Sequence, residues 1–400
     1  MKITIDDVYA ARERISGVAR RTPTEASTPI SQLLGTSAFL KYENLQLTGS
    51  FKIRGALNKI STLSEDEKKR GVIASSAGNH AQGVALSASK LGVKSTIVMP
   101  TTSSIVKQEA TRNYGANVIL HGEIYDEAFQ KAKEIQASSG AVFIHPFEDP
   151  LVMAGQGTIG LEIHEAVKDL DSVVVAIGGG GLISGIATSL KKLNPKIKVY
   201  GAVAANAPGM SQLFKGENPD LSRNCMSIAD GIAVKKPSGE MYNNYIRGLV
   251  DDVVAVSEDD IAESIVFLLE RAKCVVEGSG AATLSAARQL GKKLGSQTCV
   301  VLGGGNIDLT LMAEILDRGL TRNGRMVKIS VVVDDRPGSL SRLTKILAET
   351  GANILQVEHD RIDPVLQIRE TRITFSLETK NRQHIEEIRT ALGAQGVRIL

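Results

Sequence analysis

Tryptophan is absent from the 400-residue sequence, aromatic residues make up only 4% of it, and cysteine occurs three times. Cys225, Cys274 and Cys299 are odd in number and far apart, which excludes a CxxC metal knuckle and a fully paired disulfide framework. Such thiols are typical of a reducing, cytoplasmic environment. The missing tryptophan carries no information about function.

An excess of one charge and long apolar runs are also lacking. The 47 Lys and Arg nearly balance the 44 Asp and Glu, for a net charge of +3, so we expect no nucleic-acid partner. The most basic stretch, 318–328, is predicted to be a solvated linker. Glycines interrupt the most apolar stretch, 173–187, before it reaches the roughly 20 residues of a membrane span. The acidic N-terminal segment is unlike a signal peptide, so we expect a cytoplasmic protein without a membrane partner.

Short β-branched runs alternate with helical periodicity over residues 70–302. This alternation predicts right-handed βαβ crossovers and parallel sheets, and hence an α/β fold. The expected strands are 72–75, 96–100, 116–120, 142–144, 172–177, 198–203 and 298–302. The expected helices are 80–91, 105–114, 125–138, 182–192 and one that is capped by Ser257.

A second pattern follows a break near 319–324. Its βαββαβ order predicts a four-stranded antiparallel sheet with two helices on one face, the ferredoxin-like α+β arrangement. The expected strands are 327–333, 354–361, 368–377 and 397–400, and the expected helices are 340–350 and 381–392. We therefore expect two domains, 1–322 and 323–400.

Lys52 stands in the first of three segments that carry chemistry, residues 46–56. The spacing alone fits an ordinary exposed lysine in the first turn of a helix. The alternative is an amine held out of water or near another cation, which can form a Schiff base and move protons.

The second segment, 75–83, is rich in small residues and lies between an expected strand and an expected helix. Small side chains let backbone N–H groups approach an anion at a helix N-terminus, although a plain βα turn would look the same. His80 within this segment fits either a packed or capping residue or an acid–base group.

The third segment is a run of four glycines, 178–181, after an expected buried strand. Such a run costs conformational entropy on folding, so a phosphate cradle explains it better than a simple turn. Neither this run nor 303–305 completes G-x-G-x-x-G, and no GxxxxGK[ST] string occurs. Residues 155–160 match the first pattern, but no strand leads into them. The cradle with Lys52 therefore suggests pyridoxal 5′-phosphate rather than a nucleotide.

Together these segments resemble the serine/threonine dehydratases, pyridoxal-phosphate enzymes with the two-lobed fold of the tryptophan synthase β chain. The resemblance spans about residues 5–320 and is carried by 50–56, 76–82, 145–150, 155–160, 178–181 and 304–306. It implies a catalytic domain with a small lobe of about 53–150 inserted in a large lobe. Residues 335–340 and 351–354 resemble an ACT domain. The combination is similar to members of the family that convert L-threonine to 2-oxobutanoate and ammonia, with L-serine to pyruvate as a side activity.

The resemblance also implies roles for individual residues. Lys52 would hold the cofactor covalently and then act on the Cα proton of the substrate, with Phe51 beside the ring and Asn79 bonded to its 3′-oxygen. The implied cofactor-binding residues are Phe51, Lys52, Asn79, Gly178, Gly179, Gly180, Gly181, Leu182 and Gly303. The implied substrate-binding residues are Ser76, Ala77, Gly78, Asn79 and His80. The implied effector-binding residues of the ACT domain are Asp335, Pro337, Gly338, Asn353 and Ile354.

Three departures from related enzymes affect the expected chemistry. Gly303 replaces a Ser or Cys that contacts the pyridine nitrogen, which leaves that contact open, although we expect activity to survive. Ala77 replaces the Ser that serves serine racemases as a second acid–base group, which favours elimination over racemisation. Val203 and Gly209 stand where racemases place metal-binding acids, so no metal is expected.

Several alternatives stay open. Asp230 and Glu277 fit positions near the active site, or equally helix caps or paired surface acids. A serine-preferring dehydratase or racemase, or a catalytically idle amino-acid sensor, would share most of these motifs. The ACT-like tail is either a packing domain without ligand or a site for isoleucine or valine at a subunit interface. The latter implies an allosteric homodimer or homotetramer in isoleucine biosynthesis.

Overall fold

The computed structural model describes residues 2–222, 225–362 and 366–400. Its contacts divide the chain into two compact units, Met1–Asp308 and Leu309–Leu400. The division comes before the expected boundary at 322, because helix α15 (Leu309–Arg322) groups with the second unit. The predicted linker at 318–328 is therefore wrong for 318–322, which lie in α15, and for 326–328, which lie in strand β11 (Met326–Asp334). Apolar residues at helical spacing, with Met312 and Ile315 buried, make the first of these segments part of a helix.

Two sheets are built from the strands in the described part of the first unit. These strands are β1 (Thr24–Ala26), β2 (Ser37–Tyr42), β3 (Val72–Ser75), β4 (Ser95–Met99), β5 (Asn117–Leu120), β6 (Val142–Phe143), β7 (Ser172–Ala176), β8 (Lys198–Ala204), β9 (Asp252–Val256) and β10 (Gln297–Leu302). The larger sheet has the order β1-β2-β10-β7-β8-β9 and is parallel except that β1 runs antiparallel to β2. The smaller sheet, β5-β4-β3-β6, is parallel throughout. The predicted α/β fold with parallel sheets is confirmed, and the smaller sheet falls between β2 and β7 in the sequence.

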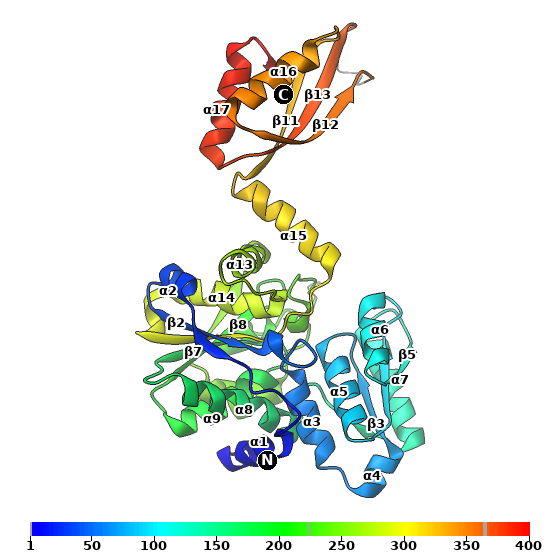
Figure 1. Ribbon diagram of the computed structural model, residues 1–400. Coiled ribbons are helices and arrows are strands. Elements are labelled where there is room, and N and C mark those ends of the chain that lie inside the picture. Colours follow the sequence, from blue (N-terminus) through cyan, green and yellow to red (C-terminus); the bar gives the residue numbers. More distant parts are fainter. Residues whose placement is uncertain (1, 223–224, 363–365) are drawn as a thin grey trace. The chain divides into compact units, whose positions relative to one another are not determined.

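Helices pack on both faces of the larger sheet. The helices of this unit are α1 (Ile5–Ile15), α2 (Thr28–Leu34), α3 (Lys52–Ser61), α4 (Glu65–Arg70), α5 (Asn79–Lys90), α6 (Ile105–Asn113), α7 (Tyr125–Ser139), α8 (Pro150–Ala166), α9 (Gly181–Leu193), α10 (Gly209–Phe214), α11 (Gly239–Met241), α12 (Arg247–Leu249), α13 (Glu258–Arg271) and α14 (Gly278–Leu290). Short 3-10 or π turns lie at Glu43–Leu45, Asp230–Ile232, Tyr242–Ile246 and Gly291–Leu294. Helices α8 and α9 lie on one side of the sheet, and α13 and α14 lie on the other (Figure 1). Ser257 caps α13 as predicted, by accepting a hydrogen bond from the backbone N–H of Asp260.

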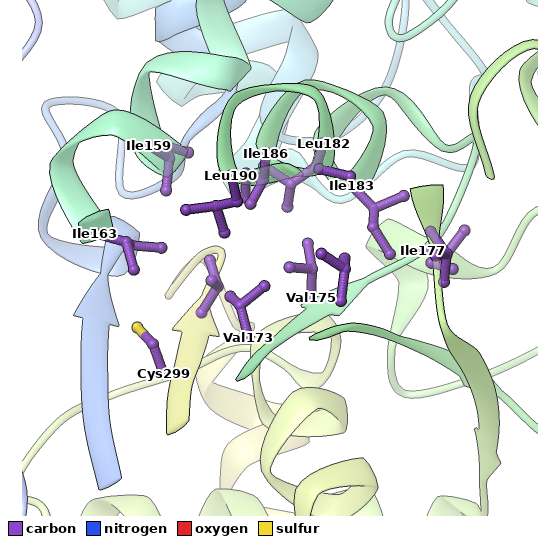
Figure 2. Close-up of a cluster of buried hydrophobic side chains, with 14 of the residues drawn as sticks. Ile159, Ile163, Val173, Val175, Ile177, Leu182, Ile183, Ile186, Leu190 and Cys299 are labelled. Atoms are coloured by element: carbon purple, nitrogen blue, oxygen red, sulfur yellow. The ribbon is translucent and has the colours of Figure 1, made fainter. Parts of the chain in front are cut away.

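The main apolar core lies between α8, α9 and the strands beneath them (Figure 2). In Figure 2 the isoleucines of α8 and the leucines and isoleucines of α9 point down onto valines of β7. The labelled members are Ile159, Ile163, Val173, Val175, Ile177, Leu182, Ile183, Ile186, Leu190 and Cys299. This core fixes the first turn of α9, because Leu182 belongs to it. Cys299 is a buried free thiol.

Helix α8 approaches both α3 and α9 so closely that backbone touches backbone. A Cβ atom on Gly155 would lie 2.5 Å from the carbonyl oxygen of Arg54 in α3. A Cβ atom on Gly185 of α9 would lie 2.4 Å from the carbonyl oxygen of Met153 in α8. Both contacts therefore require glycine. Residues 155–160 lie inside this helix, so they form no dinucleotide-binding turn.

The second unit has the predicted βαββαβ order. After α15 its elements are β11 (Met326–Asp334), α16 (Ser339–Thr350), β12 (Asn353–Asp360), β13 (Glu370–Glu378), α17 (Arg382–Ala394) and β14 (Arg398–Ile399). The strands form an antiparallel sheet of order β12-β13-β11-β14. Side chains of both helices, including Leu347 and Ile388, pack with Phe375 of β13 in one core, which confirms the ferredoxin-like arrangement. In the described part of the chain, no helix combines the length and the apolar character that a membrane span needs.

Candidate active site

Lys52 is the first residue of α3, and the segment before it is tied to the end of β10. The backbone N–H of Phe51 donates to the carbonyl oxygen of Gly303 at 3.1 Å, and Ser50 forms a β-bridge with Gly304. The Lys52 Nζ atom donates to the carbonyl oxygen of Pro146 at 3.1 Å. Burial lowers the pKa of Lys52 to about 8, although the charge of Glu277 opposes the shift. The amine is therefore neutral in part near neutral pH, as a nucleophile requires, and the structure favours the desolvated amine over an ordinary exposed lysine.

Four buried charged side chains hold α3 next to Lys52. Arg54 makes two hydrogen bonds to each of two carboxylates, at 2.9 and 2.8 Å to Glu43 and at 2.6 and 2.9 Å to Glu162. Lys41 pairs with Glu162 as well. Two positive and two negative charges thus lie together away from water. Removing one member would leave an unpaired buried charge and cost about 3–5 kcal/mol.

The glycine run forms the turn between β7 and α9. Gly180 has a left-handed backbone, with a φ of 100°. A Cβ atom on Gly179 would lie 2.2 Å from the ring of Phe147, so no larger residue fits there. The first N–H groups of α9 have no acceptor within the helix, and they carry the partial positive charge of the helix N-terminus. This cradle fits a phosphate group.

Several buried polar atoms without a partner belong to residues in or near the segments that carry the expected site. Leaving such an atom unpaired costs about 1–3 kcal/mol, so this set consists of groups that a polar ligand or water would satisfy. Its members among the described residues are Ser50 Oγ, Ser75 Oγ, His80 Nδ1, both amide atoms of Gln156 and Ser184 Oγ. The serine hydroxyls and the NH₂ group of Gln156 are donors, which suit the phosphate and ring oxygen of pyridoxal phosphate. Sequence reasoning missed Gln156 and Ser184. The signal for Gln156 was a polar residue within a helix whose neighbours are small or apolar.

Asn79 and Glu277 come from opposite sides of the site and meet. The Nδ2 atom of Asn79 lies 2.8 and 3.0 Å from the two carboxylate oxygens of Glu277 and donates to them. The Oδ1 atom of Asn79 accepts a hydrogen bond of 2.8 Å from Nδ2 of Asn306. By contrast, Asp230 is exposed and pairs with Lys107 at 2.6 Å. Glu277 is thus buried at the site, whereas Asp230 is an exposed, paired acid whose charge still acts on Glu277.

His80 is held as a neutral ring. Its Nε2 atom lies 2.8 Å from the carbonyl oxygen of Ile144, so Nε2 carries the hydrogen and Nδ1 is a bare acceptor. Burial, followed by the nearby charge of Lys52, lowers the pKa of His80 to about 3. The ring therefore offers no positive charge to a carboxylate. An anion in this loop would have to bind backbone N–H groups at the start of α5.

Gly303 faces an aromatic ring across ordinary van der Waals distance. A Cβ atom on Gly303 would lie 3.5 Å from the ring of Phe51 and 4.0 Å from a methyl carbon of Leu182. Three of the implied cofactor-binding residues, from three separate segments, therefore lie together. Glu277 lies near both Lys52 and Asn79: its charge raises the pKa of Lys52, and it accepts a hydrogen bond from Asn79.

The implied effector-binding residues lie in the second unit and form two groups. Asp335, Pro337 and Gly338 are exposed in the loop after β11, and Asn353 and Ile354 begin β12. The register places these groups at opposite ends of the sheet, roughly 25 Å apart at the usual rise of a strand. A single chain therefore does not bring them together.

Comparison with known proteins identifies the class to which this fold and site belong. Residues 15–304 match the family described as "Pyridoxal-phosphate dependent enzyme", and the chain belongs to that family. Its cofactor is pyridoxal phosphate, as expected. Residues 327–396 match the ACT domain.

Individual relatives indicate which named enzymes of this family the chain resembles. The chain is 47% identical over 397 residues to a protein of Thermotoga maritima named L-threonine ammonia-lyase, covering 99% of each chain. It is 45% identical over 320 residues to the L-threonine dehydratase catabolic TdcB of Escherichia coli (strain K12), covering 79% of this chain and 96% of that one. Among solved structures, maize serine racemase matches with a TM-score of 0.74 at 34% identity, over 80% of this chain and 99% of that one. The resemblance to the serine/threonine dehydratases is confirmed.

Proposed function

We propose that this chain is a pyridoxal-phosphate-dependent L-threonine ammonia-lyase that forms 2-oxobutanoate and ammonia, and that it converts L-serine to pyruvate more slowly. The observation that carries the proposal is the partly buried amine of Lys52, whose pKa is lowered to about 8. It donates to the carbonyl oxygen of Pro146, next to the Phe147 side chain that packs on the glycine cradle. The end-to-end similarity to an L-threonine ammonia-lyase supports the choice of substrate.

Each part of the site has a role in this reaction. When bound, pyridoxal phosphate supplies an electron sink for negative charge at the substrate Cα. The N–H groups of 178–182 bind the phosphate, and Asn79 donates toward the ring. The backbone N–H groups at the start of α5 bind the substrate carboxylate. Lys52 takes the Cα proton, and the β-hydroxyl leaves as water after protonation. One water is then consumed when the nitrogen leaves as ammonia, so the reaction needs no oxidant.

A serine racemase is the second candidate, because a solved serine racemase matches this fold over 80% of the chain. Racemisation needs an acid–base group on each face of the substrate Cα. Ala77 lies in the loop before α5 and has only a methyl group. We therefore expect elimination from L-serine and no formation of D-serine. An idle sensor would have no use for the amine of Lys52.

The proposal is tested with purified wild type, Lys52→Ala and, as a control, Lys90→Ala at the exposed end of α5. Wild type and the control should absorb visible light from bound cofactor and should release 2-oxo acid from L-threonine. The Lys52→Ala variant should lose the wild-type visible band and at least about a thousandfold in kcat/KM. A wild type without a visible absorption band, or a Lys52→Ala variant with full activity, would contradict the proposal.

We also propose that the ACT domain binds isoleucine or valine between two copies of the chain in a cytoplasmic homodimer or homotetramer. Strand β12 is an edge strand with Leu355 and Val357 exposed, and unpaired edges favour strand addition. Antiparallel pairing of two β12 strands would set Asn353 of one copy near the loop after β11 of the other. That pairing would unite the two groups of implied effector residues. Feedback by isoleucine would suit a biosynthetic role.

A further inference from the structure

Glu277 is a buried carboxylate that the proposed reaction does not use. The residue is 4% exposed and stands directly before α14, where a carboxylate ordinarily accepts hydrogen bonds from the helix N–H groups. Its side chain makes no such bond. The carboxylate turns instead toward Asn79 and the hydroxyl of Ser279, which both donate to it. The N-terminus of α14 favours a negative charge here, but it does not explain why the carboxylate points toward Asn79.

The surrounding backbone is shaped around the carboxylate. A Cβ atom on Gly304 would lie 2.5 Å from Oε1 of Glu277. The backbone N–H of Glu277 donates to the carbonyl oxygen of Gly304 at 3.0 Å, which ties α14 to the segment after β10. Burial and the charge of Asp230 raise the pKa of Glu277, while its hydrogen bonds and the charge of Lys107 oppose the shift.

The amide of Asn79 can be satisfied in only one orientation. A carboxylate only accepts, so Glu277 requires the NH₂ end of the amide. Asn306 offers its own NH₂ group, which is fixed because it also donates to the carbonyl oxygen of Thr48 at 2.7 Å. It therefore requires the oxygen end of Asn79. A flipped amide would place two donors together at one end and two acceptors together at the other.

We propose that Glu277 is a positioning residue that fixes the side-chain amide of Asn79, and thereby the donor that faces the cofactor ring. The Nδ2 atom of Asn79 carries two hydrogens and lies 2.8 and 3.0 Å from the two carboxylate oxygens of Glu277, so the proposal requires that one hydrogen serves the carboxylate and the other the cofactor. The inference rests on the proposed function only in that Asn79 donates to pyridoxal phosphate. It adds a carboxylate to the site that never touches the substrate.

A double-mutant cycle tests whether Glu277 acts through Asn79. The variants are Glu277→Gln, Asn79→Ala and the double variant, each made in the full-length chain. Glutamine keeps the shape but presents an NH₂ group that competes with that of Asn79. We expect each single change to raise the dissociation constant of pyridoxal phosphate at least tenfold and to shift the visible band of the bound cofactor. The double variant should bind within threefold of Asn79→Ala alone.

Two further variants separate positioning from general damage. Glu258→Gln changes another partly buried carboxylate of the same unit, one that accepts from the N–H of Ile228 and not from Asn79. It should leave cofactor binding and the spectrum unchanged. Glu277→Asp keeps the charge one methylene further away and should fall between wild type and Glu277→Gln. The cofactor-free Glu277→Gln protein should melt at no lower temperature than wild type, because a buried charge has been removed.

The outcomes are distinct. Effects of Glu277→Gln and Asn79→Ala that multiply in the double variant would overturn the inference, as would a Glu277→Gln protein with wild-type affinity and spectrum. In both cases wild type still binds cofactor and deaminates threonine, so the proposed function stands. A wild type that neither binds the cofactor nor reacts would overturn the proposed function and the inference together.

Discussion

At the scale of residues, the chemistry of the site depends on how water is kept from one amine. Lys52 lies at the start of α3 between Phe51 and the carbonyl oxygen of Pro146. Burial disfavours its charged form, and Glu277 returns part of that stability. The surrounding residues thus set the charge state of Lys52 before any ligand arrives.

The lowered pKa of Lys52 predicts how pH changes cofactor uptake. Only the neutral amine attacks the aldehyde of pyridoxal phosphate, and its fraction rises as pH increases through a pKa of about 8. Uptake by cofactor-free protein should therefore speed up about tenfold between pH 7 and pH 9 and then level off. Stopped-flow absorbance measures this rate. A midpoint above pH 10, the value of an ordinary lysine, would contradict the prediction.

Two neighbouring glycines should differ sharply in their tolerance of serine. Gly303→Ser places its Cβ atom 3.5 Å from the Phe51 ring, an ordinary contact, so kcat should stay within about tenfold, or 1.4 kcal/mol of barrier. Gly304→Ser places its Cβ atom 2.5 Å from the carboxylate of Glu277 and must displace it. The loss of kcat should be at least tenfold larger for Gly304→Ser. Equal kinetics of the two variants would refute this comparison.

The sequence indicated candidate residues whose chemistry is local. Lys52 and the glycine run were singled out because each lies within one short segment, although the spacing alone fits an ordinary lysine and only the resemblance implied a role for Lys52. The contact between Glu277 and Asn79 could not be predicted in this way, since the two residues lie in distant segments and only the fold brings them together. His80 shows the same limit, because its neutral state depends on burial and on the carbonyl oxygen of Ile144.

At the scale of elements, the sequence predicted strands and helices correctly where the alternation is regular, and it missed elements whose pattern is weak. The strand at 72–75 and the helix near 80–91 correspond to β3 and α5 within one residue. Strand β1 has three residues and no alternation that a pattern could reveal. Helix α15 was missed because the basic residues and glycines near 319–324 outweighed the apolar stripe before them. Charged residues indicate that a segment is exposed, whereas the spacing of its apolar residues indicates whether it is helical.

Helix α6 connects the small lobe to the larger one through Lys107. Its Nζ atom lies 2.6 Å from Asp230, which raises the pKa of Lys107 against the opposing effect of burial. Lys107→Ala should loosen the lobe over the site and raise KM for L-threonine about three- to tenfold, with kcat within twofold. The free energy of unfolding should change by less than about 1 kcal/mol, as for other partly exposed pairs. Steady-state kinetics and urea unfolding measure both.

The matched control for this helix is Lys131→Ala, which breaks a 3.0 Å pair with Glu134 inside α7 of the same lobe. It should leave KM unchanged. If Lys107→Ala and Lys131→Ala had the same KM, the ion pair between Lys107 and Asp230 would not hold the small lobe against the larger one.

At the scale of the whole molecule, catalysis and regulation should be separable. The residues proposed to bind the cofactor and the substrate all lie before residue 309, and a relative named L-threonine dehydratase catabolic TdcB matches this chain over 79% of its length. Deleting residues 324–400 should leave kcat for L-threonine within about threefold, while the response to isoleucine and valine disappears. Activity assays with and without these amino acids measure the effect. An unchanged response in the shortened protein would show that the effector binds elsewhere.

The glycine contacts of α8 affect the distance between Lys52 and the phosphate cradle. Lys52 stands at the N-terminus of α3 and the cradle at the N-terminus of α9, so a bound pyridoxal phosphate would contact two separate helices. Both helices rest on α8 at backbone distance, through Gly155 on one side and Gly185 on the other. Helix α8 thus sets the distance between the amine and the cradle. An added methyl group at either glycine would meet backbone atoms and push a helix away from α8, which would change that distance.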